Sequence, residues 1–134
     1  MMRTIALVSC GGPKVAERAR ARNLYTGSLF RDARAWAMKH ADDWRILSAK
    51  WGLVDPDEFL DPYDLSMDDL DRNDREVWGR HVRAELRKEG LWNDRLVLFA
   101  GVKYESAVEG APNVEKPLAG LGTGYRRHWF KENT

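Results

Sequence analysis

A chain of 134 residues is long enough to bury the core of one domain, so we expect a single domain over residues 1–134. Its only cysteine, Cys10, excludes an internal disulfide bond, and no Cys/His spacing would build a structural zinc site. The formal net charge of +1 argues against strong non-specific nucleic-acid binding, and no apolar run reaches the roughly 20 residues of a membrane span.

These properties predict a cytoplasmic protein without membrane contact, and no residue pattern predicts a metal or another cofactor. The charges are unevenly distributed, because Lys and Arg predominate over residues 1–39 and Asp and Glu over residues 55–76. The basic block could face a polyanion such as nucleic acid, or it could be a solvated face or an internal match to the acidic block.

The first predicted element is a strand over residues 5–8, a continuous apolar run of the kind found in strands buried on both faces. A long cationic loop over residues 11–23 follows, and loops of that length are typical of binding segments. We then expect a helix, capped by Thr26 or Ser28 and ending near residues 40–42. Its apolar face is formed by residues at helical spacing, namely Leu29, Ala33, Trp36 and Ala37.

A second buried strand is predicted over residues 44–47, followed by an acidic segment in which two prolines forbid a continuous helix. Ser66 and Asp69 approximate a capping box, so we expect a long helix from there to Gly90. A third strand follows over residues 95–100, then a short helix from Tyr104 and a fourth strand over residues 113–116. A glycine-rich turn opens a terminal helix.

Strands that alternate with helices indicate an α/β fold, here a three-layer α/β/α domain with a short, mainly parallel sheet of three to four strands. Ligands of such sheets bind beyond the carboxyl ends of the strands. We therefore expect one crevice to collect the residues that follow the three buried strands, namely Ser9, Cys10, Ser48, Lys50 and Gly101.

Several residues near this crevice have chemistry suited to a ligand. Gly11 and Gly12 would let the backbone approach it and expose N–H groups, while Lys14 and Lys50 could hold a phosphate as point charges. Cys10 would need a neighbouring base or cation to act as a nucleophile, and a buried inert thiol is favoured. Three aromatic residues could contact a base or could belong to the core, namely Tyr25, Trp51 and Tyr104.

The segment from Asp61 to Asp64 has the aspartate-proline-tyrosine sequence of the water-activating loop of uracil-DNA glycosylases. In those enzymes the motif follows the first strand, whereas here it lies well past the second, so a turn over the sheet edge is favoured. A carboxylate beside a tyrosine can still orient a water molecule or a ribose hydroxyl. Asp61, Asp64 and Lys50 are therefore the candidate catalytic residues, with Tyr63 as a ligand contact.

Five blocks in order resemble DUF6884, a family of small bacterial, archaeal and phage proteins: residues 8–11 (VSCG), 23–30 (NLYTGSLF), 46–53 (ILSAKWGL), 62–64 (PYD) and 117–124 (PLAGLGTG). The chain is also distantly similar to peroxide-stress YaaA proteins and to a domain of archaeal tRNA-modifying enzymes that handle deazaguanine bases. Relatives often have a basic residue after Ser-Cys-Gly, where this chain has Gly12. The resemblance implies a ligand related to nucleic acid or a nucleobase.

The resulting hypothesis is a nucleotide- or nucleic-acid-binding domain that acts on a nucleobase N-glycosidic bond. In it Ser9 and Gly11 hold the ligand, Lys50 neutralises phosphate, and Asp61 or Asp64 orients water. Two alternatives remain open. The first is a non-enzymatic DNA-binding protein that uses the basic surface from Lys14 to Arg34, and the second is a protein-interaction module that uses residues 55–76.

Overall fold

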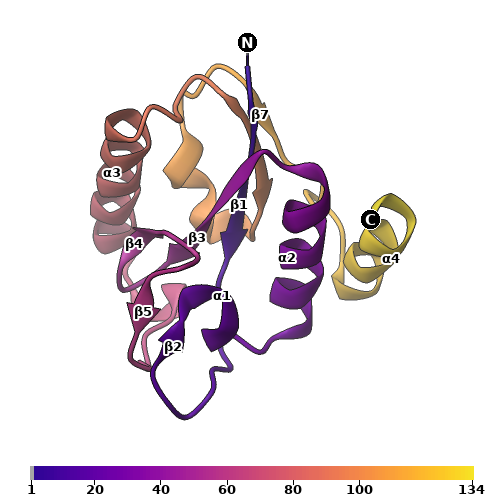
Figure 1. The fold of residues 1–134 in the computed structure, drawn as a ribbon. Coiled ribbons are helices and arrows are strands. Elements are labelled where there is room, and N and C mark those ends of the chain that lie inside the picture. The colour runs from indigo at the N-terminus through magenta and orange to yellow at the C-terminus, as the bar shows by residue number, and fades with distance from the viewer. Residues whose placement is uncertain (1) are drawn as a thin grey trace.

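The computed structural model describes residues 2–134, which form a five-stranded sheet between two helical layers (Figure 1). The strands occur in the order β4-β3-β1-β6-β7, with bounds Gly52–Val54, Asp43–Ser48, Thr4–Ser9, Arg95–Phe99 and Val114–Glu115. β3, β1, β6 and β7 are parallel, and β4 pairs antiparallel with β3. The α/β prediction is confirmed, whereas the predicted number of three to four strands is wrong.

The strand missing from the prediction is β4, which follows a tight turn after Ser48. The Ser48 hydroxyl accepts hydrogen bonds from the backbone N–H groups of Lys50 and Trp51 at 3.2 and 3.1 Å. Gly52 then adopts φ +74°, and a Cβ atom there would lie 2.9 Å from the His81 ring. The chain reverses at this glycine and pairs with the strand that it has just left.

The two helical layers cover opposite faces of the sheet (Figure 1). On one face lie α2 (Ser28–His40) and α4 (Thr123–Asn133), and on the other lie α3 (Arg72–Lys88) and the 3-10 helix η2 (Val102–Val108). Successive side chains of β1 point to alternate faces, so both faces of this central strand are buried. The parallel core strands are apolar on both sides for this reason.

Two predicted helix starts are wrong. The N-cap of α2 is Gly27 and no side chain caps it, so neither Thr26 nor Ser28 has that role. The capping box of Ser66 and Asp69 exists, but it opens only the 3-10 turn η1 (Met67–Asp69). α3 begins at Arg72, where Asp71 accepts a hydrogen bond from the backbone N–H of Asp74 at 2.8 Å. The face of α3 that packs on the sheet is apolar, and its buried residues are Trp78, Val82 and Leu86.

The predicted cationic loop is a folded segment rather than a plain connection. It contains β2 (Ala19–Arg20) and α1 (Ala21–Leu24), and β2 pairs with β5 (Phe59–Leu60) of the acidic block. Arg22 forms an ion pair with Asp57 at 2.9 Å, and Arg20 donates to the Asp57 carbonyl at 3.1 Å. Part of the basic block is thus neutralised inside the molecule.

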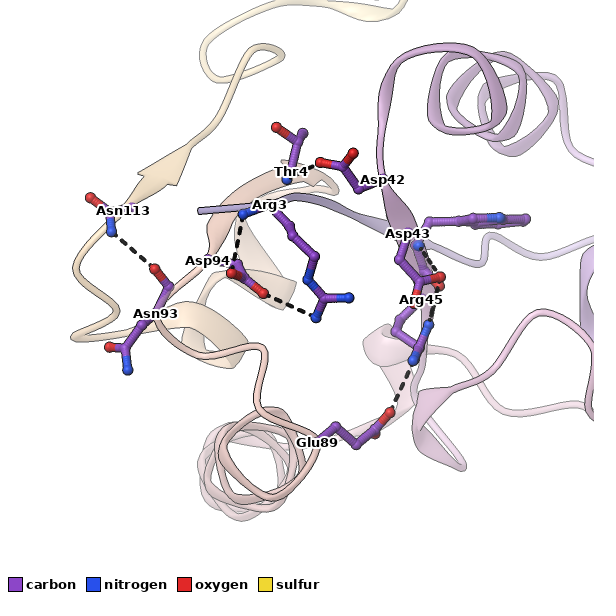
Figure 2. Close-up of polar contacts among 10 residues, drawn as sticks. Arg3, Thr4, Asp42, Asp43, Arg45, Glu89, Asn93, Asp94 and Asn113 are labelled. Carbon is purple, nitrogen blue, oxygen red and sulfur yellow. Dashed lines mark hydrogen bonds and ion pairs between the residues drawn. The ribbon is translucent and has the colours of Figure 1, made fainter. Parts of the chain in front are cut away.

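The amino ends of the strands are held together by polar contacts (Figure 2). Asp42 accepts a hydrogen bond from the backbone N–H of Thr4 at 2.7 Å, and Asp94 accepts one from that of Arg3 at 3.3 Å. Arg45 lies between the carboxylates of Asp43 and Glu89, at 3.0 and 3.1 Å. These contacts are made within the protein, so we assign a structural role to this end of the sheet. No helix within residues 2–134 is long and apolar enough to cross a membrane.

Candidate functional site

A cavity of about 400 Å³ opens at the carboxyl ends of β1 and β6. The chain leaves β1 toward α2 on one face of the sheet and leaves β6 toward η2 on the other. Such a divergence is where open parallel sheets bind their ligands. We call it the strand-end cavity, and its walls are formed by Cys10, Gly11, Gly12, Ser66, Met67, Asp68, Gly101, Val102, Lys103 and Tyr104.

One wall of the strand-end cavity is exposed backbone. Gly11 and Gly12 follow Cys10, the first residue after β1, and no residue within 2–134 accepts a hydrogen bond from either amide. A Cβ atom at Gly11 would meet nothing within 4 Å, so the space in front of this residue is open. Two N–H donors are therefore available to a ligand at this wall.

The lining also includes Tyr104, from η2. Its hydroxyl donates to the Cys10 carbonyl at 3.2 Å, and its ring packs edge-on against Trp78 with centroids 5.7 Å apart. Burial raises the pKa of Tyr104 well above its usual value, so the phenol stays protonated. These contacts fix a flat aromatic surface beside the cavity.

The charged groups in the lining are Asp68 and Lys103, which form an ion pair across the cavity rim. The hydrogen bond from Lys103 lowers the pKa of Asp68, so this carboxylate is ionised near neutral pH. Neither residue is among those singled out from the sequence. Asp68 lies within a run of acidic residues, and nothing in its spacing distinguishes it from its neighbours.

Four side chains form a hydrogen-bonded group behind the cavity, which we call the hydroxyl cluster: Cys10, Tyr25, Ser48 and Tyr63. The Tyr63 hydroxyl lies 2.6 Å from the hydroxyls of both Tyr25 and Ser48, and 3.5 Å from the Cys10 sulfur. Ser48 is 0% exposed, Tyr25 2% and Cys10 8%. Tyr63 is thus the common partner of three buried polar groups.

One assignment of protons satisfies every member of the hydroxyl cluster. The Ser48 oxygen already accepts two backbone N–H groups, so its own proton is donated to Tyr63. Tyr25 donates to Tyr63 as well, and Tyr63 donates to the Cys10 sulfur. The Cys10 thiol in turn donates to the Leu47 carbonyl at 3.1 Å. This network uses the thiol as a hydrogen-bonding group, and Cys10 is buried.

Burial is the main reason why the pKa values of the two phenols in the hydroxyl cluster differ from the usual value. It raises the pKa of both Tyr25 and Tyr63 well above the usual value, because the charged phenolate would lose its hydration. Both hydroxyls therefore remain neutral hydrogen-bonding groups across the physiological pH range.

Two lysines surround the Tyr63 ring. Lys14 Nζ lies 4.3 Å from the ring centroid and Lys50 Nζ lies 5.6 Å from it. Lys14 also donates to the carbonyl of Gly12 at 3.0 Å, which places its ammonium group at the mouth of the strand-end cavity. Within residues 2–134 neither ammonium group forms an ion pair with a carboxylate.

The structure brings together most of the residues singled out from the sequence. The lining of the cavity includes Cys10, Gly11, Gly101 and Tyr104. Adjacent to it lie the remaining cluster members and both lysines, that is Tyr25, Ser48, Tyr63, Lys14 and Lys50. Trp51 is exposed, with its ring centroid 5.0 Å from Lys50 Nζ.

Three predicted residues belong neither to the lining nor to the adjacent hydroxyl cluster and lysines. Ser9 is half-buried at the end of β1 and pairs with Leu47 in the sheet. Asp61 and Asp64 are exposed on either side of Tyr63, and within residues 2–134 their carboxylates accept no hydrogen bond. Of the acidic segment, the part that reaches the cavity is residues 66–68.

The model of a family of unknown function, DUF6884, matches residues 5–132 of this chain. The chain is 25% identical to the uncharacterised protein YfjM of Bacillus subtilis (strain 168) over 137 residues, which cover 92% of this chain and 90% of YfjM. It is 35% identical to a UPF0246 protein of Limosilactobacillus reuteri (strain DSM 20016) over 72 residues, which cover 50% of this chain but only 28% of that relative. No solved structure matches the chain.

Proposed function

This chain belongs to DUF6884, a family of unknown function, and from its own site we propose that the strand-end cavity binds a nucleotide. The observation that carries this proposal is an open strand-end cavity whose lining combines free backbone donors with an aromatic ring. A volume of about 400 Å³ lies within the usual range of small-molecule sites.

The lining suits the two faces and the edge of a nucleobase. Tyr104, Met67 and Val102 offer aromatic and apolar contact to the flat faces of the base. The amides of Gly11 and Gly12 and the hydroxyl of Ser66 can bond to the donors and acceptors on its edge. No strongly charged wall opposes a neutral base, because Asp68 and Lys103 neutralise each other.

The phosphate of the nucleotide is assigned to Lys14 and Lys50. Their ammonium groups approach the same aromatic ring, and Lys14 lies against the glycine wall of the cavity. Two like charges without a carboxylate partner favour an anion between them. This assignment predicts that a nucleoside monophosphate binds more tightly than the nucleoside.

We further propose hydrolysis of the N-glycosidic bond as the reaction at this site. Water would add to the sugar carbon, the bond from that carbon to the base would break, and the base would leave with a proton. Asp68 is the one carboxylate in the cavity lining. We therefore assign the orientation of the water to Asp68 in place of Asp61 and Asp64. The adjacent Lys103 keeps Asp68 ionised for this role.

Isothermal titration calorimetry with the four ribonucleoside monophosphates and their nucleosides tests the binding proposal. Gly11→Val places a side chain into open space, so the fold should persist while affinity falls at least tenfold. Lys50→Gln should weaken the monophosphate and leave the nucleoside unchanged. Lys88→Gln, which changes an exposed lysine at the end of α3, is the matched control. Absence of binding to the wild-type protein at millimolar ligand would refute the proposal.

The reaction is tested separately by chromatography of the incubated nucleotides. Wild-type protein should release free base, and Asp68→Asn should abolish release while binding is retained. A wild-type protein that binds a nucleotide but releases no base would refute the hydrolysis step and leave a binding domain.

A further inference from the structure

A second feature lies away from the strand-end cavity, on the outer side of α2 and α4, which we call the α2–α4 face. Figure 1 shows these helices side by side, although one follows β1 and the other ends the described chain. Together, residues 28–40 and 123–133 carry six Lys and Arg against two acidic residues, a net charge of +4 in a chain of net charge +1. The cations are Arg31, Arg34, Lys39, Arg126, Arg127 and Lys131.

In the part of the chain that the structure describes, these six cations form no ion pair with a side-chain carboxylate, whereas several other arginines of the fold do. Arg3, Arg22, Arg45 and Arg95 all form ion pairs with carboxylates. Within residues 2–134 none of the six cations of the α2–α4 face does so, and Glu132 pairs with His128 instead, at 3.0 Å. The fold therefore satisfies one part of the basic block internally and brings the other part next to the cations of α4.

The helices also enclose a recess that two of the six cations line, Arg127 and Lys131. It has a volume of about 330 Å³, and its walls include Asp32 and Ala35 from α2 and Arg127, His128 and Lys131 from α4. Arg127 and Lys131 are four residues apart, so their side chains lie on the same side of α4. These two cations thus face one hollow, which they share with Asp32.

The chemistry of this face fits a polyanion better than a protein or a lipid surface. Its exposed large apolar residues are Met38, near the end of α2, and Tyr125, near the start of α4, at 61% and 72% exposure. Protein interfaces need a desolvated apolar centre. A guanidinium group, in contrast, can bind a phosphate through two parallel N–H···O hydrogen bonds. We propose that the α2–α4 face binds the phosphate backbone of double-stranded nucleic acid.

A duplex fits this face better than a single strand. A duplex presents one negative charge for about every 1.7 Å of its axis, and a cationic helix pair can contact it without reading bases. Single strands are held instead by aromatic platforms between the cations. On the α2–α4 face the one exposed aromatic ring is Tyr125, near the start of α4. This proposal does not depend on nucleotide binding in the strand-end cavity.

Fluorescence anisotropy with a labelled DNA duplex of about 20 base pairs, at several salt concentrations between about 50 and 200 mM, tests the proposal. The variant Arg127→Glu/Lys131→Glu should weaken binding at least tenfold at the lowest salt. It should also lower the slope of log affinity against log salt by about 2, because each phosphate that is no longer neutralised changes the slope by close to one unit. The neutral variant Arg127→Gln/Lys131→Gln should show the same change of slope with a smaller loss of affinity.

The matched control is Arg80→Glu/Lys88→Glu, which makes the same change of charge at two exposed residues of α3, on the opposite face of the sheet. It should keep the wild-type slope and weaken binding by no more than about threefold through long-range repulsion. Equal losses in the two charge-reversal variants would overturn the proposal. So would tighter binding to a single strand of the same length, or no binding of the wild-type protein to the duplex.

Discussion

The hydroxyl cluster makes a quantitative prediction for the substitution Tyr63→Phe. The change removes one oxygen atom and keeps the ring between the two lysines. Tyr25 and Ser48 then lose their common partner at 2.6 Å while they stay buried. Two lost hydrogen bonds cost about 0.5–1.5 kcal/mol each, and an unsatisfied buried hydroxyl costs about 1–3 kcal/mol. We expect the free energy of unfolding to fall by about 2–4 kcal/mol.

The size of this effect depends on which hydroxyl loses its partner, so a double-mutant cycle separates the contributions. Tyr25→Phe should cost only about 0.5–1.5 kcal/mol, because Tyr63 keeps its bond to Ser48. The double variant Tyr25→Phe/Tyr63→Phe should be no less stable than Tyr63→Phe alone, because it also removes the hydroxyl that was left unsatisfied. The two substitutions should therefore be non-additive by about 1 kcal/mol or more.

Urea unfolding followed by circular dichroism measures these differences. Tyr125→Phe is the control, since Tyr125 is exposed on α4 and should change stability by less than about 0.5 kcal/mol. The reasoning is refuted if Tyr63→Phe lies within about 0.5 kcal/mol of the wild type, or if the double variant equals the sum of the two single changes.

Two further predictions follow from burial and close packing. Burial raises the pKa of three tyrosines, Tyr25, Tyr63 and Tyr104, so the folded state keeps protons that the unfolded chain releases near pH 10. The stability that these neutral phenols contribute is fully present below that pH and is lost as the pH rises above it. Absorbance at alkaline pH should show these three of the four tyrosines ionising together with the loss of circular dichroism, and ionisation ahead of unfolding would contradict the burial argument. Gly79→Ala should destabilise the protein by at least about 1 kcal/mol despite its place in a helix, because the new Cβ would lie 2.4 Å from Ser106 Oγ. The control is Gly124→Ala on α4, where the new Cβ meets nothing within 4 Å. Thermal unfolding measures both variants, and a gain in stability for both would contradict the close packing of Gly79 against Ser106.

The central strands could be predicted from the sequence because both of their faces are buried. Residues 5–8 and 96–100 are continuous apolar runs, and residues 44–47 are apolar apart from Arg45. The structure has β1, β6 and β3 at these places. β4 has only three residues, and its pairing depends on the positive φ of Gly52 rather than on an apolar pattern. The predicted start of α3 is wrong because Ser66 and Asp69 form a genuine capping box on a separate short turn.

The site was predictable to the extent that it follows the strand ends. Cys10, Gly11 and Gly101 could be located because parallel strands end at one edge of a sheet. The meeting of Tyr25, Ser48 and Tyr63 depends on a loop that folds back over that edge, and sequence spacing does not say which loop side chain turns inward. For the same reason the sequence pattern indicates Asp61 and Asp64, whereas Asp68 is the carboxylate that lines the cavity.

The central claim, that a nucleotide binds in the strand-end cavity, is tested most directly by nuclear magnetic resonance. A nucleoside monophosphate is titrated into the isotopically labelled protein, and the backbone amide signals are followed. We predict saturable shifts that are largest at Gly11, Gly12, Gly101 and Tyr104, with smaller changes on α3. Shifts confined to other surfaces, or none at millimolar ligand, would contradict the claim.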